Sequence, residues 1–186
     1  MGTRSVTMID GRFTEYDWDA KKVVDRDAPV ARFYRHFDGY PEGHGFDIAM
    51  ALALVEAEGK TNNRNLAQHC LKRLFAMDVD IEFEPSTKEH GWEHGDLDYI
   101  YKVVLPCDNS GGKESDPSSA ANAVIEVYEV GWGDDYAKTL GHDPLYSGGW
   151  RGFMEHFALA PSSPDTSGYY AATEDEIKAV LGLMGA

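Results

Sequence analysis

The 186-residue sequence has few cysteines, no long apolar run and few basic residues. Its two cysteines, Cys70 and Cys107, lack the CxxC spacing of redox and metal motifs, so we expect reduced thiols and no structural disulfide. No apolar run reaches the roughly 18 residues of a membrane-spanning helix, and the first residues lack the apolar stretch of a signal peptide. We therefore expect a cytoplasmic protein with no membrane partner.

The deficit of basic residues leaves a strongly acidic chain. Lysine and arginine total 17 against 32 aspartates and glutamates, which gives a net charge of −15. Because nucleic-acid binding depends largely on basic side chains that contact phosphates, we expect no direct nucleic-acid partner. Two interpretations of the acidity stay open: a solvated surface that keeps the protein soluble, or an acidic face that binds a basic partner protein.

Common nucleotide and nucleophile motifs are also absent. The segment Gly39-x-x-x-Gly43-x-Gly45 is followed by no Gly-Lys-Ser/Thr, and its spacing is not the Gly-x-Gly-x-x-Gly of dinucleotide-binding proteins. Ser110 and Ser147 precede glycine pairs in loop sequences, which are not nucleophile elbows. We therefore expect no cofactor and no activity that depends on these motifs.

What the chain does contain is enough apolar material, 42% of residues, for one domain with a real core over residues 1–186. Polar–apolar alternation predicts about five strands, at residues 5–9, 31–37, 79–83, 98–105 and 123–130. Apolar residues spaced three and four apart predict one helix capped by Asp47 and ending at Gly59, and another starting at Thr61. The expected fold is α+β, a mainly antiparallel sheet packed against this helical hairpin.

Three segments complete this expectation. Residues 10–29 form a polar connection, whose charged middle at residues 17–27 is either an extended hairpin or a short surface excursion. Residues 106–121 form a flexible loop rich in Gly, Ser and Pro. Residues 131–186 are rich in aromatics and contain short helices, at 150–159 and after Thr173, which forms a capping box with Glu176. The aromatic stretch at 131–136 would either stack on a flat ligand or pack in the core or an interface, so a homo-oligomer is possible.

The densest group of functional side chains lies in the turn at residues 38–45. Three glycines and Pro41 favour an unusual backbone path that carries four such side chains, Asp38, Tyr40, Glu42 and His44. This turn has three interpretations: a structural turn, a general base with its orienting partner, or a binding site for an anion at free amides of the helix start. In the third, Arg4 and Arg35 would supply positive charge.

Strand alternation limits which arginine can take part. Arg35 lies on the same strand face as Phe33, and Arg32 lies on the opposite face, so only one of the two arginines faces any given pocket.

The segment from His90 to Asp96 is the best metal candidate. His90 and His94 are four residues apart and Asp96 follows them, so these side chains, with His44, could complete a zinc or iron site. Glycines within the segment, however, indicate a loop instead of the helix on which such histidine pairs usually lie. We therefore expect no resident metal.

Two motifs carry a resemblance. Thr3-Arg-Ser-Val-Thr7 and the turn Tyr34-Arg-His-Phe-Asp-Gly-Tyr-Pro41 resemble a group of uncharacterised phage, prophage and bacterial proteins that share Thr-Arg-Ser and Tyr-Arg-x-x-Asp-Gly-Tyr-Pro before a helix. Asp98-Tyr-Ile-Tyr-Lys-Val103 is similar to their sheet strand. The group carries no established activity, so the resemblance implies a setting only, that of small acidic phage proteins that counter host defence.

Three functional hypotheses follow. The first is a non-catalytic, phage- or prophage-encoded counter-defence factor that sequesters a small anionic, nucleotide-like ligand at the 38–45 turn, in the host cytoplasm. The second is an acidic inhibitor that docks on a basic surface of a host nucleic-acid-binding or defence complex. The third is a metal-dependent hydrolase that uses the segment from His90 to Asp96.

Overall fold

Six strands form one mixed sheet in the computed structural model, which describes residues 2–59, 63–77, 81–83, 96–106, 120–161 and 172–185. The strand order is β3-β2-β1-β4-β5-β6, and the strands are β1 (Ser5–Asp17), β2 (Lys22–Arg35), β3 (Ile81–Phe83), β4 (Tyr99–Pro106), β5 (Val124–Glu129) and β6 (Tyr146–Gly148). Neighbouring strands are antiparallel except β1 and β4, which are parallel. The predicted α+β class is confirmed, and the count of about five strands omitted β6.

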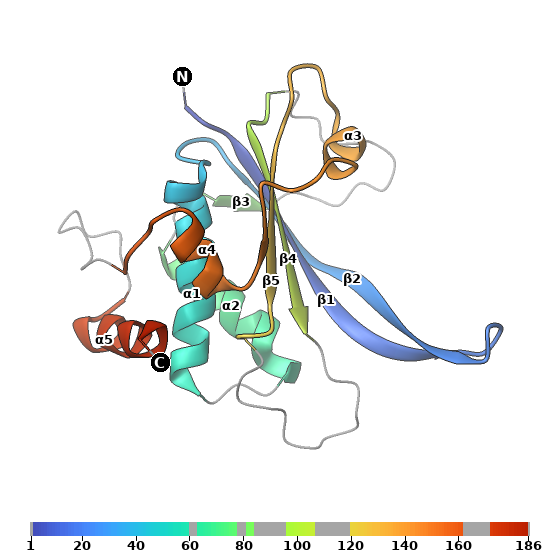
Figure 1. Ribbon diagram of the computed structural model, residues 1–186, viewed down its shortest axis with the longest axis horizontal. Helices are drawn as coiled ribbons and strands as arrows, with labels where there is room; N and C mark the ends of the chain where they lie inside the picture. Colours follow the sequence, from blue (N-terminus) through green and yellow to red (C-terminus); the bar gives the residue numbers. More distant parts are fainter. Residues whose placement is uncertain are drawn as a thin grey trace.

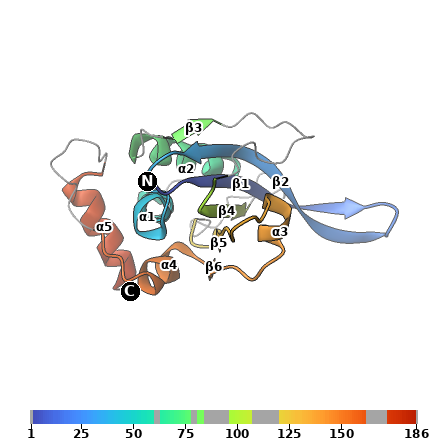
Figure 2. The same ribbon diagram turned by 90° about the horizontal axis from the view of Figure 1, so that it is seen from above.

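The first two strands extend beyond the sheet as a two-stranded arm. Pairing of β1 with β2 runs from Ser5 opposite Arg35 to Asp17 opposite Lys22, whereas β4 accompanies β1 only as far as Arg12. We call residues 12–27 the arm, and Figures 1 and 2 show it projecting from the sheet. Of the two interpretations of residues 17–27, the extended hairpin is confirmed, and most of the expected connection around them belongs to β1 and β2.

Helices cover mainly one face of the sheet. Figures 1 and 2 show α1 (Phe46–Glu58), α2 (Asn63–Met77), α4 (Trp150–His156) and α5 (Glu174–Met184) on one side, and α3 (Tyr136–Leu140) on the other. We call these sides the helix face and the α3 face. Eight consecutive residues of α1, from Ile48 to Val55, are buried, because α2, α4 and α5 all pack against this helix.

The sequence predicted the end of α1 correctly and its start incorrectly. The helix ends at Gly59, whose φ of 61° is left-handed, and this prediction is confirmed. The expected cap is wrong, because a π turn, η1 (Pro41–Gly45), leads directly into α1 and Gly45 occupies the cap position. Asp47 lies inside the first turn of α1 and pairs with Arg35 instead.

Apolar side chains form a separate cluster on each face. On the helix face, Ile9, Phe33 and Val103 pack with α1 and with the buried rings of Trp150 and Phe153. The cluster on the α3 face is smaller and consists of Val6, Met8, Tyr34, Ile100 and Tyr128, with Leu97, Val130 and Leu140 packed against it.

The C-terminal helix is fixed by the predicted cap and by ion pairs. The Thr173 hydroxyl accepts from the Glu176 amide at 3.3 Å, and the Glu176 carboxylate accepts from the Thr173 amide at 2.7 Å, so the capping box is confirmed. Arg73 of α2 pairs with both Glu58 and Glu176, which links α5 to the helical hairpin. Most of the predicted loop at 106–121 lies outside the described residues. Within the described part of the chain, every helix is too short or too polar to span a bilayer.

Candidate functional site

The 38–45 turn is closely packed against the start of β1. The Gly39 amide donates to the Thr3 carbonyl at 3.0 Å, and the Tyr101 hydroxyl donates to the Gly39 carbonyl at 2.8 Å. A Cβ at Gly39 would lie 2.8 Å from the Ser5 backbone nitrogen, and one at Gly43 would collide with the Asp38 carbonyl. The glycines of this turn therefore have a packing role that needs no ligand.

The amides of the turn are already hydrogen bonded. Those of Gly43 and Gly45 donate to the Tyr40 carbonyl at 3.0 and 3.4 Å, and that of His44 donates to the Asp38 carbonyl at 2.9 Å. The sequence analysis expected free amides that could bind an anion, and at these three positions that expectation is wrong. The π turn uses the amides internally, so they do not form the anion site that a helix start often provides.

His44 is buried and neutral. Its side chain lies between β1 and β2, with Nε2 2.6 Å from the Thr7 hydroxyl and Nδ1 3.5 Å from the Arg35 guanidinium. Burial, and then the Arg35 charge, lower the pKa of His44 to about 3. A guanidinium can only donate, so the Arg35 contact needs an unprotonated Nδ1, whereas the Thr7 hydroxyl can either donate to Nε2 or accept from it.

This arrangement separates the side chains of the general-base interpretation. The His44 ring is 1% exposed, so it lies away from groups at the surface that could act with it. Asp38 and Glu42 lie on the exposed outer side of the turn. The three side chains that the sequence analysis grouped as base and orienting partner are thus split between the interior and the surface.

Arg35 is directed inward, on the same strand face as Phe33, as alternation predicted. Its guanidinium donates to the Phe37 carbonyl at 2.6 Å and to Asp47 Oδ2 at 3.2 Å, and only 11% of its side chain is exposed. Burial raises the pKa of Asp47 to about 6, and the opposing effect of Arg35 is smaller. Arg35 therefore neutralises a buried carboxylate and is not presented to solvent beside Tyr40.

The remaining predicted residues are at the surface. Tyr40 is exposed, and the neighbouring Asp38 carboxylate raises its pKa. Arg4 forms an ion pair with Asp96, and its amide donates to Asp98 at 2.8 Å. The exposed outer side of the turn thus presents carboxylates, and Arg4, its nearby cation, is already paired.

Most residues of the proposed metal site lie outside the described part of the chain. His90 and His94 are both outside it, and Asp96 forms an ion pair with Arg4. Within the described ranges, no three His, Cys, Asp or Glu side chains group closely enough to hold a metal ion.

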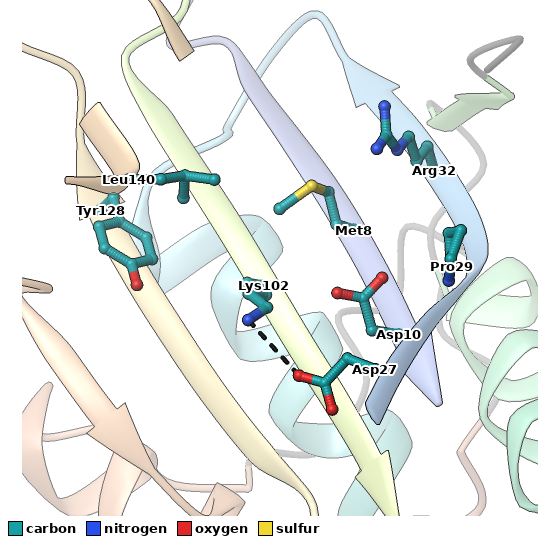
Figure 3. Close-up of a pocket in the computed structure, with 8 residues that line it drawn as sticks. All are labelled: Met8, Asp10, Asp27, Pro29, Arg32, Lys102, Tyr128 and Leu140. Carbon is teal, nitrogen blue, oxygen red and sulfur yellow. Dashed lines mark ion pairs between the residues drawn. The ribbon is translucent and has the colours of Figure 1, made fainter. Parts of the chain in front are cut away.

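A cavity of about 410 Å³ lies on the α3 face, and the sequence analysis did not predict it. Figure 3 shows residues that line it, from β1, β2, β4 and β5 and from helix α3: Met8, Asp10, Asp27, Pro29, Arg32, Lys102, Tyr128 and Leu140. Sheet register brings them together, because Met8 pairs with Arg32 on β2 and with Lys102 on β4. One feature of the sequence could have indicated this cavity. Polar residues such as Asp10 and Lys102 occupy strand positions whose neighbours on the same face of the sheet are apolar.

Charge in the cavity is mixed, and one cation is loosely held. Lys102 Nζ lies 3.8 Å from Asp27 Oδ2 and 3.8 Å from Glu126 Oε2, and both distances are longer than a hydrogen bond. Asp27 instead accepts two hydrogen bonds from Arg12, at 2.9 and 3.2 Å, and these lower its pKa. Burial raises the pKa of Asp10. Lys102 thus lies near three carboxylates: it pairs with Asp27 and Glu126, and its charge opposes the effect of burial on the pKa of Asp10.

Comparisons with known proteins found no match to this chain among family models, curated proteins or solved structures. The resemblance to the phage and bacterial group stays a prediction, and the argument for function depends on the geometry of the chain itself.

Proposed function

We propose that this protein is a non-catalytic binding protein that holds a small anionic, nucleotide-like ligand in the α3-face cavity. The observation that carries the proposal is the Lys102 ammonium, which lines this cavity with no carboxylate within hydrogen-bond distance in either of its ion pairs. The volume of about 410 Å³ lies within the range of small-molecule sites, roughly 300–1,000 Å³.

The lining matches the parts of such a ligand. Lys102 and Arg32 provide positive charge for a phosphate or carboxylate group. Tyr128 and Met8 provide an aromatic ring and a polarizable apolar contact for a flat ring system. Asp10, together with Asp27, provides acceptors for amino or hydroxyl groups. These carboxylates also repel dense negative charge, so a ligand with one phosphate fits better than a polyphosphate.

The contacts of the 38–45 turn also support this choice of site. Its amides are engaged, Arg35 is paired with Asp47, and its exposed side chains include Asp38 and Glu42. The burial of His44, which is 1% exposed and contacts the Thr7 hydroxyl, supports a role without catalysis at this position. We therefore place the ligand site across the sheet from the turn.

Thermal-shift and calorimetric titrations with nucleoside monophosphates, cyclic mononucleotides and nucleoside triphosphates test this proposal. We expect a monophosphate or cyclic mononucleotide to stabilise the protein, by about 2.7 kcal/mol at a hundredfold excess over the dissociation constant. Lys102→Met should weaken binding at least about tenfold, the usual effect of removing a charged hydrogen-bond partner.

Two control variants separate the possible outcomes. Lys178→Met removes the same charge from an exposed position on α5 and should leave binding unchanged. Tyr40→Ala probes the turn and should also leave binding unchanged. Binding that is lost in Tyr40→Ala but kept in Lys102→Met would return the site to the turn, and a panel without any binding would refute the proposal.

The biological setting is a further part of the proposal: a phage or prophage protein that counters host defence by sequestering a nucleotide signal. Its support is the resemblance of Thr3–Thr7 and of the 38–45 turn. The other two hypotheses stay predictions. A host protein that binds this chain at low salt, and whose affinity falls steeply as the salt concentration rises, would favour the acidic inhibitor. Metal that copurifies with the protein in a stoichiometric amount would favour the hydrolase.

A further inference from the structure

The arm ends in an apolar group of side chains that is exposed to solvent. Tyr16 and Val23 face each other across the two strands and are 46% and 63% exposed. Trp18 at the tip is 82% exposed, and its ring lies 4.8 Å from the Tyr16 ring in an edge-on arrangement. Aromatic side chains with this exposure on a projecting element are typical of an interaction surface.

Polar contacts hold the arm in one shape. Arg12 binds Asp27 across the strands through two hydrogen bonds, and Arg26 pairs with Asp17 at 3.7 Å. Asp17 Oδ1 also accepts from the Asp19 amide at 3.0 Å and from the next amide at 2.9 Å, which fixes the turn. An isolated two-stranded ribbon is only marginally stable, so these contacts contribute to the stability of the arm. An arm that is already ordered loses less conformational entropy when it binds a partner.

We propose that the arm is a self-association element, whose apolar face packs against the same face of a second copy about a two-fold axis. In a contact of this kind, both copies use the same surface. Charge supports a copy of the chain as the partner. The whole chain has a net charge of −15, yet residues 12–27 carry four basic and five acidic side chains. Two copies that meet at their arms therefore repel each other less than two copies that meet at more acidic parts of the chain.

The charges around the tip are arranged for such a contact. Asp17 and Asp19 lie where β1 ends, and Lys21 and Lys22 lie where β2 begins. A two-fold axis parallel to the strands of the arm places the acidic strand end of one copy against the basic strand start of the other, and the reverse. Each contact then contains two sets of opposite charges around Trp18 and its neighbours.

Face-to-face packing fits the arm better than pairing of strand edges. Pro29 at the base of the arm has no amide hydrogen to donate, and Lys22 is the residue type that commonly guards an exposed edge. An arm of this size offers less area than the interfaces of stable complexes, so the dimer belongs to the weak, transient class. It should form at high micromolar protein concentration.

Sedimentation equilibrium over a wide concentration range tests the proposal. We expect reversible dimers of the wild type and a dissociation constant raised about tenfold or more by Trp18→Ala, the usual effect of removing a central aromatic anchor. Trp132→Ala removes a tryptophan that is 95% exposed in the loop after β5 and serves as the matched control. Circular dichroism melts verify that both variants fold.

A charge-swap pair tests the two-fold arrangement. Asp19→Lys makes the tip more basic, and Lys21→Asp with Lys22→Asp makes it more acidic; Lys21 has a φ of 52°, which aspartate tolerates. Each variant alone should associate more weakly than the wild type, and an equimolar mixture should associate more tightly than either. A wild type that is monomeric at every concentration, equal effects of Trp18→Ala and Trp132→Ala, or no gain on mixing would overturn the proposal.

Discussion

His44 should make the protein sensitive to acid, and the sign follows from its burial. In the folded chain its pKa is about 3, whereas an unfolded histidine titrates near about 6.5. Between these values the unfolded chain binds a proton that the folded chain excludes. The stability associated with neutral His44 is therefore complete above the unfolded value and is lost as the pH falls toward the folded value.

The size of the effect follows from the same two values. Each pH unit between the folded and unfolded pKa values of His44 changes the free energy of unfolding by about 1.4 kcal/mol. Lowering the pH from about 7 to about 4 therefore lowers that free energy by about 3 kcal/mol through this residue. Domains are commonly stable by about 5–15 kcal/mol, so this loss is a large share of the total.

Asp47 opposes His44 over part of this range. Burial raises its pKa to about 6 from an ordinary value of 3.8, so the folded chain binds a proton that the unfolded chain does not. That difference stabilises the protein as the pH falls from about 6 toward 3.8. The pH profile of the wild type alone therefore conceals the contribution of His44, and a comparison with a variant is needed.

The assay is urea unfolding, followed by circular dichroism, at about pH 7 and about pH 4. Between these pH values the wild type should lose about 3 kcal/mol more than His44→Gln, because the variant lacks the titrating ring and retains Asp47. His142→Gln, which removes an exposed imidazole 3.9 Å from Asp134, is the control for the loss of a histidine side chain as such. Equal pH dependence of the wild type and His44→Gln would refute the assignment of His44 as a buried neutral ring.

Three further predictions concern other parts of the chain. Gly45→Ala should destabilise the protein by about 1–3 kcal/mol in chemical denaturation, because the added Cβ would lie 2.7 Å from the Phe153 ring; unchanged stability would contradict this packing. Thr173→Ala should cost about 1 kcal/mol in the same assay through loss of the α5 cap, and Thr173→Ser should retain most of it. Cys70 should react with a thiol reagent only after unfolding, because it is buried and burial raises its pKa to about 12. Peptide mapping distinguishes its labelling from that of Cys107, and rapid labelling of Cys70 in the native protein would contradict its burial.

Local patterns in the sequence predict most of the elements, because each depends on neighbouring residues. Alternation locates β1, β2, β4 and β5, and the glycine after α1 marks its end. The parallel pairing of β1 with β4 depends on a contact between distant segments that no local pattern encodes. The three-residue strand β6 and the five-residue helix α3 are too short to show a period.

The candidate site shows the same division. The 38–45 turn was recognisable because its unusual residues are contiguous, but the sequence does not reveal that Gly39 packs on Ser5 or that His44 points inward. Members of the α3-face cavity such as Lys102 and Tyr128 come from different strands, and only the register of the sheet places them together.

The base of the arm is also a wall of the cavity. Asp10 and Asp27 line the cavity, and the arm begins just beyond the register shift between Ile9 and Asp10. Lys102 and Tyr128, on the opposite wall, belong to β4 and β5 in the body of the sheet. Asp27 is therefore shared by both features: it lines the cavity and accepts two hydrogen bonds from Arg12 across the arm. A substitution of Asp27 would remove a carboxylate of the cavity and a cross-strand contact of the arm at the same time.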